Sequence, residues 1–186
     1  MSDNKHIVFE EIYLNYFSKM KNFAKEYVLS DEDAENIVQD IFLELWEKRE
    51  ILGMPLNIIA YLFTAIKNRC IDLLRHKILV KEVAEKLQEE HLFTLQMKFY
   101  SLEAFDQNLF VEKDIEQIIT QAIDALPEKC KAIFIKSKIE GKKQKEIAAE
   151  LNISVNTIET QMSIAYKKLK LLLKDYFLIF LFLLYL

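Results

Sequence analysis

Side chains that can bond to nucleic-acid bases recur at helical spacing in the last third of the chain. Residues 145–151 predict a short helix, residues 152–154 a tight connection and residues 155–169 a longer helix, which is the spacing of a helix-turn-helix. Ser154 suits the N-cap of the longer helix because its hydroxyl can accept a backbone N–H. Amides and hydroxyls on this helix can bond base edges in a major groove, and lysines can contact phosphates. The candidate DNA-contacting residues are Lys143, Ser154, Asn156, Thr157, Glu159, Thr160, Gln161, Ser163 and Lys167.

A second stripe combines an aromatic ring, an amide and charged side chains between residues 61 and 77. A ring together with cations suits unstacked single-stranded DNA, where stacking is worth roughly 1–3 kcal/mol per base. For His76 and Lys77 the alternative is a basic face that stabilises the carboxyl end of the helix. The candidate strand-binding residues are Tyr61, Lys67, Asn68, Arg69, Asp72 and Arg75.

A third surface places acids around one exposed leucine. Residues 30–33 predict a helix start, because Ser30 can cap it and acids favour its positive end. The apolar residues of 34–46 form its buried stripe, and the opposite face can steer a basic partner that Leu43 anchors. A solvated face with one stray leucine is the alternative. The candidate partner-binding residues are Asn36, Gln39, Asp40, Leu43, Trp46 and Glu47.

Composition and charge restrict the fold that positions these residues. The chain has 186 residues with two glycines and two prolines, which argues against β-rich folds with many tight turns. Helical spacing accounts for nearly every segment, so we predict an all-α fold. Within a total charge of −4, residues 31–50 carry −6, residues 51–78 carry +3 and residues 129–174 carry +7. These blocks predict one acidic and two basic binding surfaces.

The helices are predicted to form two small domains joined by a linker. Residues 5–78 form a three-helix module, and residues 112–175 form the module that contains the helix-turn-helix. Residues 79–111, where periodicity weakens and the net charge is −3, form a partly helical linker. Residues 176–186 are an apolar tail that is too short to cross a bilayer alone. Packing of this tail on one of the modules is favoured over insertion into lipid.

No arrangement for catalysis is found. His6, His76 and His91 share no ligand or triad spacing with one another or with the two cysteines, and no glycine-rich phosphate loop occurs. We therefore expect no catalytic residue, metal, cofactor or small-molecule substrate. Two cysteines without C-x-x-C spacing and a polar N-terminus predict a cytoplasmic protein.

Four segments follow the residue order of one known family. Residues 126–134 and 140–158 closely resemble the promoter-reading domain four of bacterial RNA polymerase sigma factors of the extracytoplasmic-function group. Residues 33–46 and 60–75 resemble domain two of the same family. The resemblance covers most of residues 8–175, and the two motifs in this order are more specific than either alone.

The resemblance implies that the chain gives core RNA polymerase its promoter specificity. The acidic face would dock on a coiled coil of the polymerase large subunit. The strand-binding helix and the loop before it, residues 49–57, would melt the minus-ten element and hold a flipped base. The helix-turn-helix would read the minus-thirty-five element. Members of this group are generally held inactive by an anti-sigma factor, often membrane-embedded, and such a partner is implied here as well.

Two other functions compete with this interpretation. A stand-alone helix-turn-helix transcriptional regulator would leave the acidic and aromatic stripes of residues 5–78 without a role, and it would bind duplex DNA without polymerase. An interaction protein at the membrane would depend on the apolar tail at residues 176–186.

Overall fold

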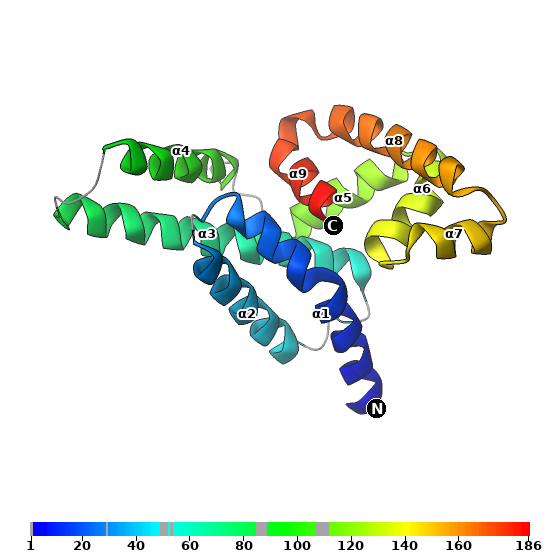
Figure 1. Ribbon diagram of the computed structural model, residues 1–186, viewed down its shortest axis with the longest axis horizontal. Helices are drawn as coiled ribbons and strands as arrows, with labels where there is room; N and C mark the ends of the chain where they lie inside the picture. Colours follow the sequence, from blue (N-terminus) through cyan, green and yellow to red (C-terminus); the bar gives the residue numbers. More distant parts are fainter. Residues whose placement is uncertain (1, 29, 49–51, 53, 85–88, 107–111) are drawn as a thin grey trace. The chain divides into compact units, whose positions relative to one another are not determined.

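The computed structural model of the chain describes residues 2–28, 30–48, 52, 54–84, 89–106 and 112–186. Over these residues it contains nine α-helices and no strand (Figure 1), which confirms the predicted all-α fold. The chain divides into two compact units, Met1–Glu112 and Lys113–Leu186. Each unit has its own set of buried apolar side chains.

The first unit is built on three helices that pack through one apolar core. They are α1 (Ser2–Lys25), α2 (Asp31–Glu47) and α3 (Pro55–Ala84), and α1 and α3 both contact α2 (Figure 1). The stripe predicted on residues 34–46 is buried on α2 from Ala34 to Leu45. The largest fully buried side chains of this core are Met20, Phe23, Ile41, Leu45, Ile59, Leu62, Phe63 and Ile66.

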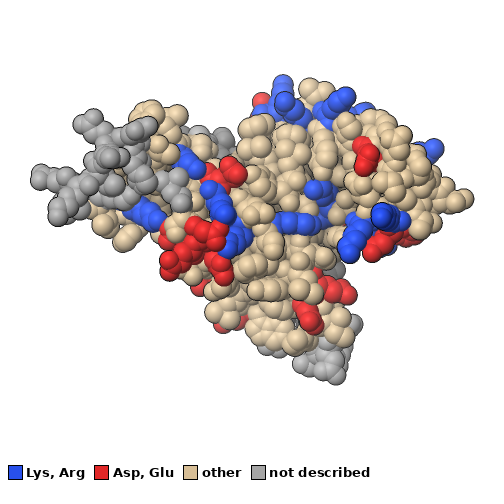
Figure 2. All heavy atoms as spheres, viewed as in Figure 1, with Lys and Arg blue, Asp and Glu red and all other residues tan. Residues whose placement is uncertain are grey.

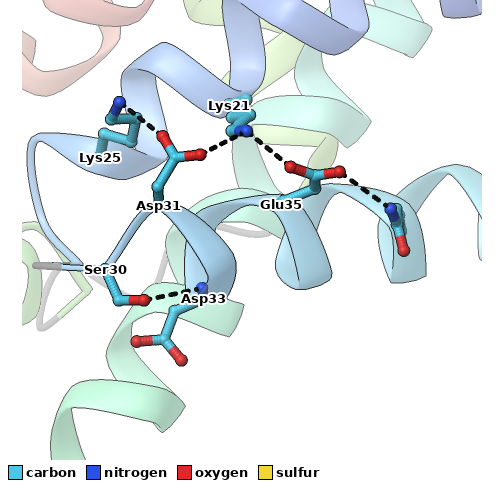
Figure 3. A network of polar contacts seen from close by, with 7 residues as sticks. Lys21, Lys25, Ser30, Asp31, Asp33 and Glu35 are labelled. Atoms are coloured by element: carbon cyan, nitrogen blue, oxygen red, sulfur yellow. Dashed lines mark hydrogen bonds and ion pairs between the residues drawn. The ribbon is translucent and has the colours of Figure 1, made fainter.

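The start of α2 is fixed by a cap and by ion pairs to α1 (Figure 3). The Ser30 hydroxyl accepts the backbone N–H of Asp33 at 3.3 Å, as the sequence predicts. Asp31 pairs with Lys21 at 2.7 Å and with Lys25 at 2.6 Å. These hydrogen bonds from Lys21 and Lys25 lower the pKa of the Asp31 carboxyl to about 2. A carboxylate is also stabilising near the positive end of a helix. The acids here therefore fix the position of α2 and also contribute to its negative charge.

The segment that was predicted to be a partly helical linker contains more helix than expected. Helix α3 begins at Pro55, where the fixed φ of proline suits the first turn, and it continues to Ala84. Helix α4 (Glu89–Asp106) follows and packs along α3 (Figure 1). Leu95 and Leu102 of α4 are fully buried, because a seven-residue spacing keeps both side chains on one helix face.

The second unit contains the predicted helix-turn-helix. Helix α7 (Gln144–Leu151) and helix α8 (Val155–Leu172) are joined through Asn152, whose φ of 51° and ψ of 49° are left-handed. Asparagine tolerates this conformation better than most residues, so the turn can be tight. The unit also contains α5 (Glu112–Asp124), α6 (Glu128–Phe134), the π-helical turn Ile135–Ile139, the 3-10 turn Lys174–Tyr176 and α9 (Phe177–Tyr185).

The apolar tail forms α9, which contacts α8. Five of its side chains, from Leu178 to Leu183, are buried, and Lys138 donates to the carbonyl of Leu184 at 3.2 Å. Packing was the favoured alternative for this tail, and the burial agrees with it. None of the helices is both long enough and apolar enough to cross a membrane, over the residues that the structure describes.

Candidate functional site

Helix α8 presents most of the predicted DNA-contacting residues on one exposed face. The Ser154 hydroxyl accepts the backbone N–H of Thr157 at 3.1 Å, so this serine caps the helix. Thr160 donates its hydroxyl to the carbonyl of Asn156 at 2.9 Å. The helix buries the opposite face through Ile158 and other apolar residues. The exposed candidates are Asn156, Thr157, Glu159, Thr160, Ser163 and Lys167 on α8, Ser154 at its N-cap, and Lys143 before α7.

Thr157, which is exposed, and Gln161, which is half-buried, lie where α8 faces α6. Both line a groove of about 290 Å³ together with Lys129 and apolar residues of α6 and of the turn after α7. The carboxamide oxygen of Gln161 accepts a hydrogen bond from the Cys130 thiol at 2.9 Å. Eight of the nine residues predicted as one set are therefore exposed, and Gln161 is half-buried in the wall of this groove.

The lysines around the helix-turn-helix fall into two groups. Lys131 pairs with Asp124 at 2.6 Å, and Lys136 and Lys142 both pair with Glu150. These two lysines lower the pKa of the Glu150 carboxyl. Figure 2 shows several lysine side chains over the visible face of this unit. The exposed lysines without an ion pair among the described residues are Lys129, Lys143, Lys145, Lys167, Lys168, Lys170 and Lys174.

Two residues of the predicted strand-binding stripe are not on the surface. Tyr61 is 3% exposed and Lys67 is 2% exposed, so the expectation that an open ring and cation lie there is wrong. The Tyr61 ring has the Lys48 ammonium 4.6 Å from its centroid, and its hydroxyl lies 3.5 Å from a Glu44 oxygen. The ring thus packs where α2 and α3 meet. Spacing within α3 alone could not show that α2 packs over this ring.

Three other cations of α3 are paired with acids. Arg69 pairs with Glu44, and Lys77 pairs with Asp33. Arg75 pairs with Asp72 at 3.2 Å and lies 5.8 Å from the Phe99 ring of α4. Asn68, Asp72 and Arg75 are exposed together along α3. The predicted loop before α3 includes residues 49–51 and 53, which lie outside the described residues.

The polar face of α2 is exposed as predicted. Leu43 is 61% exposed, and Asn36, Gln39, Asp40 and Glu47 are exposed on the same helix. Glu35 is committed to Lys21 at 2.6 Å and accepts from Gln39 at 3.4 Å. Within the described part of the chain, Asp40 and Glu47 have no ion-pair partner.

Trp46 belongs to an aromatic cluster rather than to the open face. Its ring is half-buried and meets Phe9 edge-on at 4.9 Å and His6 at 5.5 Å. With Glu10 and Tyr13 these residues line a groove of about 350 Å³ between α1 and α2. This groove was not predicted from the sequence, although His6, Phe9 and Tyr13 repeat at helical spacing and could have indicated it.

The described residues contain no group of three side chains able to hold a metal ion. Cys70 and Cys130 are free thiols, and both are buried. Burial raises the pKa of the Cys70 thiol to about 12, so this thiol stays protonated at neutral pH and lacks the reactivity of a thiolate.

An all-helical chain with a helix-turn-helix unit and a separate unit that has an acidic, leucine-centred face has the architecture expected of a two-part DNA-binding factor. Residues 12–77 match the family model for sigma-70 region 2, and residues 116–169 match the model for sigma-70, region 4. The chain belongs to the sigma-70 family, in its extracytoplasmic-function group, and it is an RNA polymerase sigma factor.

Two curated relatives cover nearly the whole chain. The ferric citrate uptake sigma factor FecI of Escherichia coli (strain K12) is 25% identical over 173 residues, 91% of this chain and 93% of the relative. The ECF RNA polymerase sigma factor RpoE of Cereibacter sphaeroides is 23% identical over 163 residues, 87% of this chain and 84% of the relative. The region 2 match assigns the first unit to the same family, so a stand-alone helix-turn-helix regulator is not favoured.

Proposed function

We propose that the two units divide the work of promoter recognition. The first unit, which contains the module predicted at residues 5–78, docks on core RNA polymerase and opens the minus-ten element. The second unit, with residues 112–175, reads the minus-thirty-five element through α8. The observation that carries this division is the exposed polar face of α8, whose lysines have no ion pair among the described residues, since base contacts and phosphate contacts are then available on one helix.

The proposed polymerase contact centres on Leu43. An exposed apolar side chain ringed by polar groups has the form of an interface anchor, and the free carboxylates of Asp40 and Glu47 would attract a basic partner. The groove lined by Phe9 and Trp46 on the same unit offers additional apolar contact area. Asn36 and Gln39 add neutral amides, which can exchange hydrogen bonds across an interface without a buried charge.

Leu43→Asp should prevent stable association with bacterial core RNA polymerase. Loss of an interface anchor typically costs at least about 2 kcal/mol, or roughly a 30-fold weaker complex. Leu14→Asp is the matched control, because Leu14 is 73% exposed on α1. The measurement is co-purification of the full chain with core polymerase. Equal binding by both variants would reject Leu43 as the anchor.

The proposed minus-ten contact starts from Asn68, Asp72 and Arg75, which are exposed together on α3. Tyr61 and Lys67 would support this helix from within the unit, and Arg69 would become available only when it leaves Glu44. Run-off transcription by core polymerase with the full chain tests the whole assignment. Initiation at a defined promoter class, lost when either promoter element is scrambled, is the expected result, and initiation indifferent to both elements would reject the assignment.

Further partners follow from the family. We propose an anti-sigma factor, in this group often membrane-embedded, that would cover the polymerase face or the DNA faces. Because core polymerase and promoter DNA are the proposed targets, the proposed place of action is the cytoplasm. The boundaries of a linker at residues 79–111 and of a tail at residues 176–186 are part of this proposal. Helix α4 lies within the first of these segments and belongs to the first compact unit.

A further inference from the structure

We infer that the Cys130 thiol orients the Gln161 carboxamide so that Gln161 reads DNA as a hydrogen-bond donor. The inference rests on the proposed role of α8 in reading the upstream element. It assigns to Cys130 a positioning role, since this cysteine would act on DNA only through Gln161.

The two side chains come from helices that pack against each other. Cys130 lies on α6, Gln161 lies on α8, and the thiol donates to the carboxamide oxygen at 2.9 Å. Cys130 is 2% exposed, whereas Gln161 is half-buried. The oxygen and the nitrogen of a carboxamide point in diverging directions. With its oxygen held against α6, Gln161 has its nitrogen as the amide atom that is left for a ligand.

This orientation changes which base edge Gln161 can recognise. A carboxamide with both atoms available makes a paired contact with adenine, accepting from N6 and donating to N7. With the oxygen turned toward Cys130 of α6, the NH₂ group that points away from it offers two donors. Guanine presents two acceptors in the major groove, N7 and O6, and thymine presents O4. The structure therefore favours guanine or thymine over adenine at the base pair that Gln161 meets.

The groove beside Gln161 shows why a fixed orientation matters. Gln161 and Thr157 form part of the wall of this groove of about 290 Å³, which also contains Ala132 and Ile133 of α6. The open volume leaves the carboxamide room to rotate once its partner is removed. A thiol is also a small, largely apolar group that tolerates burial, so Cys130 can donate from inside α6 without exposing a strongly hydrated side chain.

Base selection by the holoenzyme tests the inference. The full chain bound to bacterial core polymerase would be used to select duplex promoter fragments with a randomised upstream element. Gln161→Ala should lower the preference at one base pair by roughly tenfold. Cys130→Ala should lower the preference for guanine or thymine over adenine at that same base pair by about fivefold, the effect of one lost hydrogen bond. Cys130→Ser, which keeps a donor, should retain the preference.

The double variant separates a positioning role from a structural one. If Cys130 acts through Gln161, Cys130→Ala should have no further effect on base preference in the Gln161→Ala background. Cys70→Ala is the matched control, because Cys70 is a buried cysteine of the first unit, and it should leave upstream preference unchanged. Thermal unfolding of every variant identifies losses that come from the fold.

Three results would overturn the inference. They are an unchanged preference in Gln161→Ala, a Cys130→Ala effect that persists in the double variant, and a Cys130→Ala variant that melts earlier but selects the same bases. A wild-type holoenzyme that enriches no upstream sequence would instead remove the proposed function, and the role of Gln161 with it.

Discussion

The two surfaces proposed to meet DNA carry similar residue types but differ in how much of their charge is available. On α3, Lys67 is buried, and Arg69 and Lys77 are held by acids of α2. Around the helix-turn-helix, seven lysines are exposed without an ion pair in the described part of the chain, whereas Lys131, Lys136 and Lys142 are paired. The sequence charges of +3 and +7 understate this contrast.

The contrast follows from the range of electrostatic forces. An acid within an ion pair cancels the field of its cation beyond a few ångströms, and salt screens the remainder over about 8 Å at physiological ionic strength. Free lysines keep their field and can release counterions from a duplex. We therefore expect the second unit to bind double-stranded DNA more readily than the first. On α3, Arg69 and Lys77 would have to leave Glu44 and Asp33 before they could bind a strand.

The largest effect should come from removing the free lysines of α8. The triple variant Lys167→Ala, Lys168→Ala, Lys170→Ala should bind duplex DNA roughly 100-fold more weakly at physiological salt, because each phosphate contact contributes about fivefold there. The slope of log affinity against log salt should fall by about 2 to 3. Both are measured by fluorescence anisotropy with the full chain and a labelled duplex over a salt series.

The matched triple variant removes the same charge from paired lysines. Lys131→Ala, Lys136→Ala and Lys142→Ala together should change the salt slope much less, because these ammonium groups already face Asp124 and Glu150. Equal slopes for the two triple variants would show that ion pairing does not set the availability of these lysines, and the contrast between the two surfaces would fail.

A smaller effect is expected when the pairing on the first unit is released. Glu44→Gln removes the carboxylate that holds Arg69 and lies beside Tyr61. Affinity of the full chain for a single-stranded oligonucleotide should rise about three- to fourfold, the contribution of one phosphate contact to a single strand. Anisotropy with a labelled strand measures it. An exposed ion pair is worth at most about 1 kcal/mol, so the fold should persist.

Asp40→Asn is the control for the change in net charge. Asp40 is exposed on the same helix and has no ion pair among the described residues, so this variant changes the charge without releasing a cation. The same gain in both variants would mean that Arg69 was never held back by Glu44.

Much of the fold follows from local sequence signals. Ser30 and Ser154 cap the helices that they were predicted to cap, since a cap depends on residues three positions apart. The π-helical turn Ile135–Ile139 was not foreseen, and neither was the length of helix over residues 79–84 and 89–106. Packing of α4 on α3 stabilises a segment whose own periodicity is weak, and tertiary contacts of this kind leave no local pattern.

The sequence predicted the residue types of the candidate site, but it did not predict which side chains are held by other residues of the chain. Helical spacing correctly predicted that Leu43 and Asn156 are exposed, because each lies opposite a clear apolar stripe. Spacing could not show that Glu44 reaches Arg69 across 25 residues or that Cys130 reaches Gln161 across 31. Such contacts depend on how helices cross, and one sequence contains no direct record of the crossing.

The smallest effect concerns the ion pairs that attach α2 to α1. Hydrogen bonds from Lys21 and Lys25 lower the pKa of Asp31 from an ordinary 3.8 to about 2. Between these values the unfolded chain binds a proton that the folded chain does not, so this stabilisation is complete above the unfolded pKa and is lost as pH falls toward 2. Asp31→Asn should therefore lower the free energy of unfolding slightly at about pH 6 and progressively less toward about pH 3.

Urea unfolding at each pH measures the difference, and added salt should reduce it because Asp31 is exposed. Glu32→Gln, an exposed neighbour without an ion pair among the described residues, should show less of this pH dependence. A difference that stays constant with pH would mean that the Ser30 cap and apolar packing stabilise the start of α2. The ion pairs of Asp31 with Lys21 and Lys25 would then contribute nothing to stability.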